Sequence, residues 1–190
     1  VLDAVYVSAV ALATLGLGDV VPTAGWLRIA VPVQALIGFG LLTASVTWVL
    51  QIDPALIRRR ALAVRLAQLR SIPFDDLLLD PQTGSAAVLL DGLAGELAQA
   101  RVDLTQYSET YYFRDGTEEA ALPAMIQVAA DLASAGRRAP RTDVRLAAVR
   151  LGRAVDDFAQ VVDDQFLHTG AGADDVLLAY GRDHHYADRG

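Results

Sequence analysis

Six consecutive residues near the start of the sequence, Thr14-Leu15-Gly16-Leu17-Gly18-Asp19, have types and spacing suited to coordinating a cation. Two glycines flank a bulky residue, and the run carries no charge before Asp19. Glycine permits backbone conformations in which a strand-like loop turns its carbonyl groups inward. A ring of such carbonyl oxygens can replace the water around a dehydrated cation. We refer to these six residues as the TLGLGD loop.

The segments on either side of the TLGLGD loop are apolar. Asp3 to Ala13 would form a helix of about 16 Å, about half of the 30 Å hydrocarbon core of a bilayer. Such a helix enters a membrane without crossing it, and non-helical backbone at that depth is tolerated where it lines a watery cavity. Ile29 to Leu50 has 22 residues without a formal charge and predicts a transmembrane helix, with Trp26 and Trp48 as interfacial anchors.

In this setting the segment Tyr6 to Pro22, YVSAVALATLGLGDVVP, resembles the pore helix and selectivity filter of potassium channels, whose usual filter reads Thr-Val-Gly-Tyr-Gly-Asp. The resemblance implies that residues 14–17 present coordinating carbonyl oxygens, and that Thr14 adds its hydroxyl. It further implies that Gly18 allows the turn outward and that Asp19 lies at the external mouth behind the filter. Leu17 departs from the usual Tyr, although some second loops of two-pore-domain channels also carry Leu there.

A dinucleotide-binding turn is the competing interpretation of the glycine pair. That fold needs a third glycine at the start of a helix and an acidic residue about twenty positions on. Val21 and Pro22 occupy the region of the third glycine, and a membrane-length apolar run follows. The sequence therefore favours the channel interpretation.

The resemblance also implies an assembly. Potassium channels place four pore loops around one axis, so one loop per chain implies a homotetramer, or a dimer if a second loop lies upstream. The chain does not begin with Met, and we expect the outer membrane helix of the pore to lie upstream. Permeant potassium ions and the lipid bilayer are the expected partners, with no cofactor and no other metal.

Gly38 and Gly40 lie in the middle of the predicted membrane helix, where glycine weakens helical structure. Gly38 follows Gly18 by twenty residues, a spacing similar to that of the gating-hinge glycine of the family's inner helix. Small residues also let helices approach closely in lipid. Hinge and packing roles both stay open at this stage.

Basic residues follow the membrane helix directly, at Arg58, Arg59, Arg60 and Arg65. An excess of positive residues close to a membrane helix marks the cytoplasmic side. We therefore expect a multi-pass protein of the cell membrane, with its C-terminal region in the cytoplasm. The same arginines could also contact anionic lipid headgroups.

The rest of the chain carries helical patterns only. Ser71 to Gly84 reads as a linker, and helices are predicted at about Ser85 to Tyr107, Glu118 to Ala135 and Thr142 to Thr169, with a short one at Asp174 to Tyr180. Thr117 is the expected N-cap of the second helix. The third has the clearest apolar stripe: Leu151, Val155, Phe158, Val162 and Phe166.

These patterns predict an all-α membrane protein, in which a re-entrant pore helix, a filter loop and an inner helix precede a cytoplasmic helical bundle. The expected divisions are a pore domain at 1–52, a basic juxtamembrane helix and linker at 53–84, a helical domain at 85–180 and a polar tail at 181–190. The helical domain does not resemble the nucleotide-binding domains of many prokaryotic potassium channels. An assembly role is favoured over a ligand sensor.

Composition excludes several other classes. Hydrophobic residues make up 53% of the 190 residues, with the excess in the first fifty. A net charge of -7 argues against a nucleic-acid partner, and the absence of Cys excludes disulfides and thiolate metal sites. Asp164 and His168 have the spacing of two metal ligands on one helix face, but one pair is too few, and His184 and His185 are expected on a solvated tail beside Asp183 and Asp188. No Ser/His/Asp set or carboxylate pair indicates an enzyme.

The sequence thus favours a subunit of a potassium-selective channel that conducts passively. A weakly selective cation channel is an alternative with the same fold, and mixed-ion reversal potentials separate the two. A non-conducting membrane receptor with a partner-binding bundle is the other alternative, and single-channel recording separates it from a channel.

Overall fold

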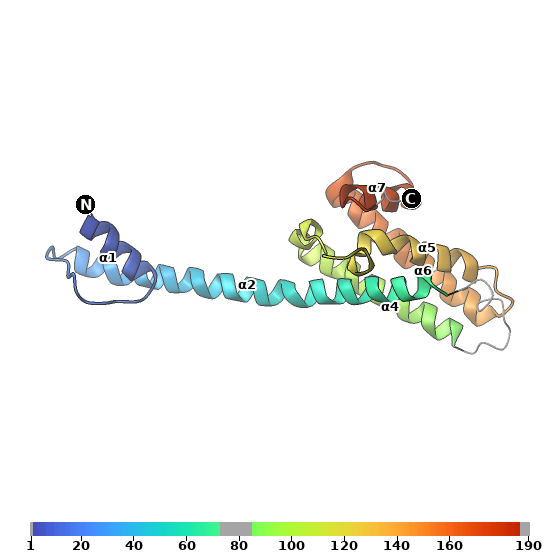
Figure 1. Cartoon of the computed structure of the whole chain (residues 1–190), viewed down its shortest axis with the longest axis horizontal. Coiled ribbons are helices and arrows are strands. Elements are labelled where there is room, and N and C mark those ends of the chain that lie inside the picture. The colour runs from blue at the N-terminus through green and yellow to red at the C-terminus, as the bar shows by residue number, and fades with distance from the viewer. Residues whose placement is uncertain (1, 73–84, 187–190) are drawn as a thin grey trace. The chain divides into compact units, whose positions relative to one another are not determined.

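The computed structural model describes residues 2–72 and 85–186 (Figure 1). Every regular element in these ranges is a helix, and α2 (Leu27–Arg70) is long and apolar enough to cross a membrane. The predicted all-α membrane fold is confirmed. The chain divides into two compact units, Val1–Asp53 and Pro54–Gly190, which we call the N-terminal and C-terminal units.

The N-terminal unit consists of α1 (Leu2–Leu12), the TLGLGD loop and the first part of α2. Helix α1 has 11 residues and matches the predicted short pore helix to within one residue at each end. Helix α2 contains the predicted membrane segment and does not end near Leu50, since it continues through Pro54 to Arg70. Pro54 therefore removes one backbone hydrogen-bond donor from α2 without ending the helix.

The C-terminal unit is a bundle of α4 (Ala86–Gln106), α5 (Leu122–Gly136), α6 (Thr142–Val162) and α7 (Ala173–Asp183), together with residues 54–70 of α2. Two 3-10 turns, η1 (Ser108–Tyr112) and η2 (Glu118–Ala120), lie between α4 and α5, and a π-helical turn, η3 (Asp163–Leu167), follows α6. Helices α4, α5 and α6 lie close to the three longer helices predicted for this region. Helix α7 extends three residues beyond its predicted C-terminal end.

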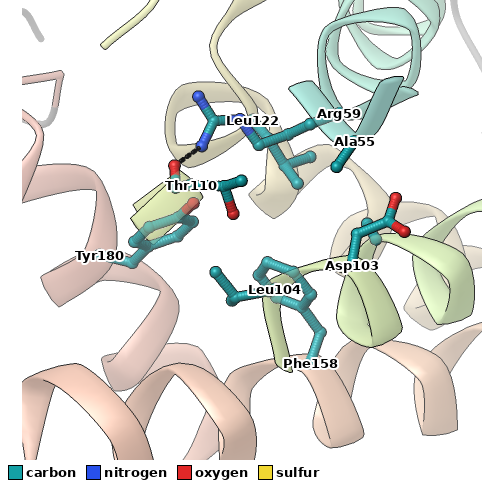
Figure 2. Close-up of a pocket in the computed structure, with 9 residues that line it drawn as sticks. Ala55, Arg59, Asp103, Leu104, Thr110, Leu122, Phe158 and Tyr180 are labelled. Atoms are coloured by element: carbon teal, nitrogen blue, oxygen red, sulfur yellow. Dashed lines mark hydrogen bonds between the residues drawn. The ribbon is translucent and has the colours of Figure 1, made fainter. Parts of the chain in front are cut away.

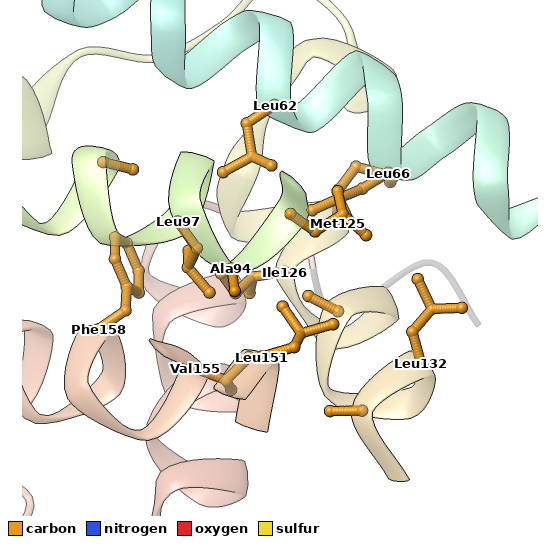
Figure 3. Close-up of a cluster of buried hydrophobic side chains, with 14 of the residues drawn as sticks. Leu62, Leu66, Ala94, Leu97, Met125, Ile126, Leu132, Leu151, Val155 and Phe158 are labelled. Carbon is orange, nitrogen blue, oxygen red and sulfur yellow. The ribbon is translucent and has the colours of Figure 1, made fainter. Parts of the chain in front are cut away.

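A single apolar core joins these helices (Figure 3). Leu62 and Leu66 from α2 meet Leu97 from α4, Met125 from α5 and Leu151 from α6, and all five are at most 2% exposed. The expected division was a basic juxtamembrane helix and linker at 53–84, followed by a helical domain at 85–180. Residues 54–70 contribute Leu62, Ala63, Leu66 and Leu69 to the bundle core. The expected linker falls largely on 73–84, outside the described residues.

Two predicted helix ends differ in the structure. Thr117 precedes only the 3-10 turn η2, and α5 begins after Ala121, where Pro123 occupies the first turn and needs no intrahelical donor. The third helix ends at His168, which has a left-handed φ of 53° and precedes Thr169, the predicted end of this helix. Because His168 has left the helix, it does not share a helical face with Asp164.

The expected solvated tail at 181–190 begins in the core. His184 is 4% exposed, and its ring nitrogens lie 3.1 Å from the Tyr180 carbonyl oxygen and 2.7 Å from that of Tyr111. The Tyr111 hydroxyl donates to Asp183 at 2.7 Å, and its ring stacks on Phe166. Burial raises the pKa of Tyr180 to about 12. The placement of His184 on a solvated surface was therefore wrong, whereas His185 is exposed and Asp188 lies outside the described residues.

Candidate ion-coordination loop

The TLGLGD loop begins as the cap of α1. The Thr14 N–H donates to the Ala11 carbonyl at 3.0 Å, and the Leu15 N–H donates to the Val10 carbonyl at 3.0 Å. These two bonds form the Schellman pattern that satisfies the last carbonyls of a helix, with Thr14 in the left-handed position at φ 57°. A β-branched residue is strained in that region. Such strain, which costs of the order of 1–3 kcal/mol, is typical of functional sites.

Left-handed residues alternate along the loop. Thr14, Gly16 and Gly18 have φ values of 57°, 55° and 76°, while Leu15 and Leu17 between them have negative φ. In an extended strand successive carbonyls point to opposite sides, whereas alternation between the two hands of the backbone brings successive peptide groups to the same side. The loop therefore has the backbone pattern needed for a row of carbonyl oxygens on one side.

Backbone angles explain the two glycines of this loop. A Cβ added to Gly16 or Gly18 would meet no atom of this chain within 4 Å, so space within one subunit does not require glycine. Both residues instead occupy left-handed conformations that other residues rarely adopt. Gly25, further along the same connection, has equally open surroundings and no left-handed φ.

A side-chain hydrogen bond ties the end of the loop to α1. The Tyr6 hydroxyl donates to the Asp19 carboxylate at 2.7 Å, across thirteen residues of sequence. Sequence reasoning placed Asp19 behind the filter and gave no role to Tyr6. The pairing of the one tyrosine of α1 with the one acidic residue of the loop was the signal available for this bond.

The two candidate hinge glycines have different surroundings. A Cβ on Gly38 would lie 1.9 Å from the carbonyl oxygen of Leu12, so α1 and α2 touch backbone to backbone at this point. Close by, the Gln34 amide donates to the Ser8 hydroxyl. A Cβ on Gly40 would meet nothing within 4 Å. The geometry thus gives Gly38 a packing role between the two helices, and nothing in the described structure requires glycine at position 40.

The four arginines expected to orient the chain in the membrane all pair within the C-terminal unit. Arg58 donates two bonds of 2.8 Å to Asp103, and this carboxylate raises the pKa of the Arg58 guanidinium. The other pairs are Arg59 and Arg60 with Asp115, and Arg65 with Glu96. Sequence reasoning missed these carboxylates because they lie 31 to 56 residues away along the chain.

Arg59 is a core residue. It is 7% exposed and donates to the carbonyl oxygens of Thr110 and Phe113 as well as to Asp115. It therefore cannot contact lipid headgroups from this position, which excludes it from the lipid-contact interpretation. Figure 2 shows Arg59 above Thr110 and Tyr180, beside a cavity of about 10 Å³ that has room for one water molecule at most. The cavity is too small for an organic ligand.

Metal-ligand clusters are absent from the described residues: no three His, Cys, Asp or Glu side chains gather there in a way that could hold an ion. Asp163, which neighbours the Asp164–His168 pair judged too small for a metal site, is engaged with the end of η3. The hydroxyl and N–H of Thr169 each donate to it at 2.7 Å, and these bonds hold the pKa of Asp163 below its usual range. Asp163 thus has a capping role.

Comparison with known families supports the channel interpretation of the N-terminal unit. A family described as "Ion channel" matches residues 1–52, the segment that holds α1, the TLGLGD loop and the membrane-length part of α2. Comparisons with curated proteins and with solved structures give no match. The match covers residues 1–52 of the 190-residue chain, and it supports an ion channel in that part of the chain.

Proposed function

We propose that four copies of this chain form a channel that conducts potassium passively, with the TLGLGD loop as its selectivity filter. The alternation of left-handed and right-handed backbone at residues 14–18 is the observation that carries this proposal. Four such loops around one axis would present rings of carbonyl oxygens. Rings of this kind replace the hydration shell of potassium.

Each residue of the loop has a proposed task. The carbonyl groups of Thr14, Leu15, Gly16 and Leu17 coordinate the ion, and the Thr14 hydroxyl adds an inner site. Gly18 turns the chain outward. Asp19 lies behind the filter at the external mouth, where its bond to Tyr6 ties the loop to α1.

The C-terminal unit is proposed to be cytoplasmic. Orientation is set by Lys and Arg near the ends of a membrane helix during insertion, when acidic residues contribute little. The pairing of Arg58, Arg60 and Arg65 in the folded bundle is therefore compatible with their role as orientation signals.

The test is potassium flux through the purified protein in liposomes, with matched glycine variants. Gly16→Ala should abolish the flux, because alanine disfavours the left-handed backbone at φ 55°. Gly25→Ala should conduct normally, because it lies in the same connection, has open space and lacks that constraint. Normal potassium flux through Gly16→Ala would contradict the proposed filter.

Reversal potentials in mixed potassium and sodium test selectivity separately. Leu17 stands where the usual filter has Tyr and has no hydroxyl to hydrogen-bond around the filter. We expect potassium selectivity, with a higher sodium permeability than that of a Tyr-filter channel in the same assay. Equal permeability of the two ions would identify a weakly selective cation channel. Absence of single-channel currents in protein that is folded and inserted would favour the receptor alternative.

A further inference from the structure

Helix α2 has an apolar face in the C-terminal unit that the bundle does not cover. Ile57 is 55% exposed and Val64 is 40% exposed, and Pro54, Ala61 and Gln68 are exposed with them. These five residues are separated alternately by three and four positions, so they form one stripe along the helix. No charged residue belongs to the stripe, which we call the α2 seam.

The α2 seam lies opposite the face that packs into the bundle. The buried residues of the same segment, which include Leu62, Leu66 and Leu69, point about half a turn away from Ile57 and Val64 at 100° per residue. The bundle core is therefore complete without the seam. The exposed side has the 3,4 apolar spacing of a coiled-coil contact surface.

The same spacing extends upstream along α2. Counting back from Pro54 in steps of four and three reaches Leu50, Thr47 and Thr43, all within the membrane-length part of the helix. In the sequence, this spacing therefore continues into the membrane-length segment. If channel subunits surround one axis, covalent continuity brings the segment just beyond each membrane helix close to its counterparts.

The charged residues beside the α2 seam form ion pairs within the same chain. Arg58 and Arg65 on one flank are bonded to Asp103 and Glu96, and Arg60 on the other flank is bonded to Asp115. Parallel copies of a helix place identical residues at the same level, so unpaired arginines would repel one another there. The intrachain ion pairs reduce this repulsion and leave an apolar strip between the two flanks.

From these observations we propose that the α2 seam is a subunit interface, and that its partner is the seam of further copies of this chain in a parallel helical assembly. The proposal rests on the multi-subunit channel proposed above. It goes further by assigning a contact outside the membrane and the residues that make it.

Thiol cross-linking of the full-length protein in membranes tests the proposal directly. The sequence contains no Cys, so one introduced thiol gives an unambiguous signal. Treatment of Ile57→Cys and Val64→Cys with a short bismaleimide should shift the monomer band to a linked dimer band on a denaturing gel. Val88→Cys, on α4 and 74% exposed, is the control and should remain a monomer.

Potassium flux is measured on the same preparations, so that the two proposals can fail separately. Monomer bands for both seam variants, in membranes that conduct potassium, would overturn the seam and leave the channel intact. Linked seam variants in membranes without any potassium flux would support the seam and count against the proposed function.

A second measurement uses charge. The double variant Ile57→Glu, Val64→Glu should shift the purified protein from its tetramer peak toward smaller species in size-exclusion chromatography, because like charges would meet along the seam. Val88→Glu should leave the peak unchanged. An unshifted peak for the double variant, with an unchanged helical circular-dichroism spectrum, would overturn the proposal.

Discussion

Loss of the Asp115 charge should weaken the C-terminal unit. Its side chain is 2% exposed and accepts hydrogen bonds from Arg59 at 3.0 Å and from Arg60 at 2.6 Å. The substitution Asp115→Asn keeps the shape of the side chain and removes its charge. Arg59 would then stay buried with uncharged acceptors only, namely the Thr110 and Phe113 carbonyls and the amide oxygen of the new Asn.

The cost follows from the burial of this pair. Removing one partner of a buried ion pair costs about 3–5 kcal/mol, because the remaining charge is left uncompensated. The two carbonyl acceptors of Arg59 and the retained oxygen of Asn offset part of that loss, so we expect about 3 kcal/mol. For a domain of this size, that corresponds to a fall of roughly 10 °C in the melting temperature.

Thermal unfolding of the isolated unit 54–190, followed by circular dichroism, measures this effect. Asp91→Asn is the control, because Asp91 pairs with Arg150 between two helices at 3.1 Å and is 44% exposed. Exposed pairs contribute about 0–1 kcal/mol, so the control should melt close to the unsubstituted protein. Equal melting temperatures for the two variants would show that the buried Arg59–Asp115 ion pair stabilises the unit no more than the exposed Asp91–Arg150 pair does.

Three further outcomes are expected. Gly38→Ala should reduce the thermal stability of the assembled membrane protein while Gly40→Ala does not, because only the former places a Cβ within 1.9 Å of the Leu12 carbonyl; equal stability would contradict the packing role. The C-terminal unit should lose stability between about pH 10 and pH 12. In this window Tyr180 is ionised in the unfolded chain but stays protonated in the folded one, because burial raises its pKa to about 12. A denaturation midpoint that stays constant from pH 9 to 12 would refute this. A fragment of residues 85–190 should melt without cooperativity while 54–190 melts cooperatively, because the former lacks the core side chains of α2; cooperative melting of both would show that these side chains are dispensable.

Local patterns were sufficient to predict much of this molecule. The TLGLGD loop is contiguous in the sequence, and its two glycines by themselves indicate backbone conformations with positive φ. The helices α4, α5 and α6 follow from apolar periodicity, which depends only on residues three and four apart. Boundaries were less accurate where the chain leaves a helix without a standard signal, as at His168.

Long-range contacts account for what the sequence did not reveal. The row of arginines after the membrane helix fits the positive-inside pattern, and its partners Asp103 and Asp115 lie 45 and 56 residues away from Arg58 and Arg59. Likewise, His184 lies among polar neighbours in the sequence, and its burial depends on Tyr111 and Tyr180. Such contacts depend on tertiary packing, which residue spacing along one helix does not determine.

The participation of α2 in both units limits how the protein can be recombined with others. A chimera that joined residues 1–84 of this chain to a foreign domain at the expected linker would leave Leu62, Leu66 and Leu69 without their packing partners. The bundle of this chain, if it were moved to another protein without residues 54–70, would lack the core side chains of α2. An exchange of modules should therefore be spliced within α2, between Asp53 and Pro54, where the two units meet in the sequence.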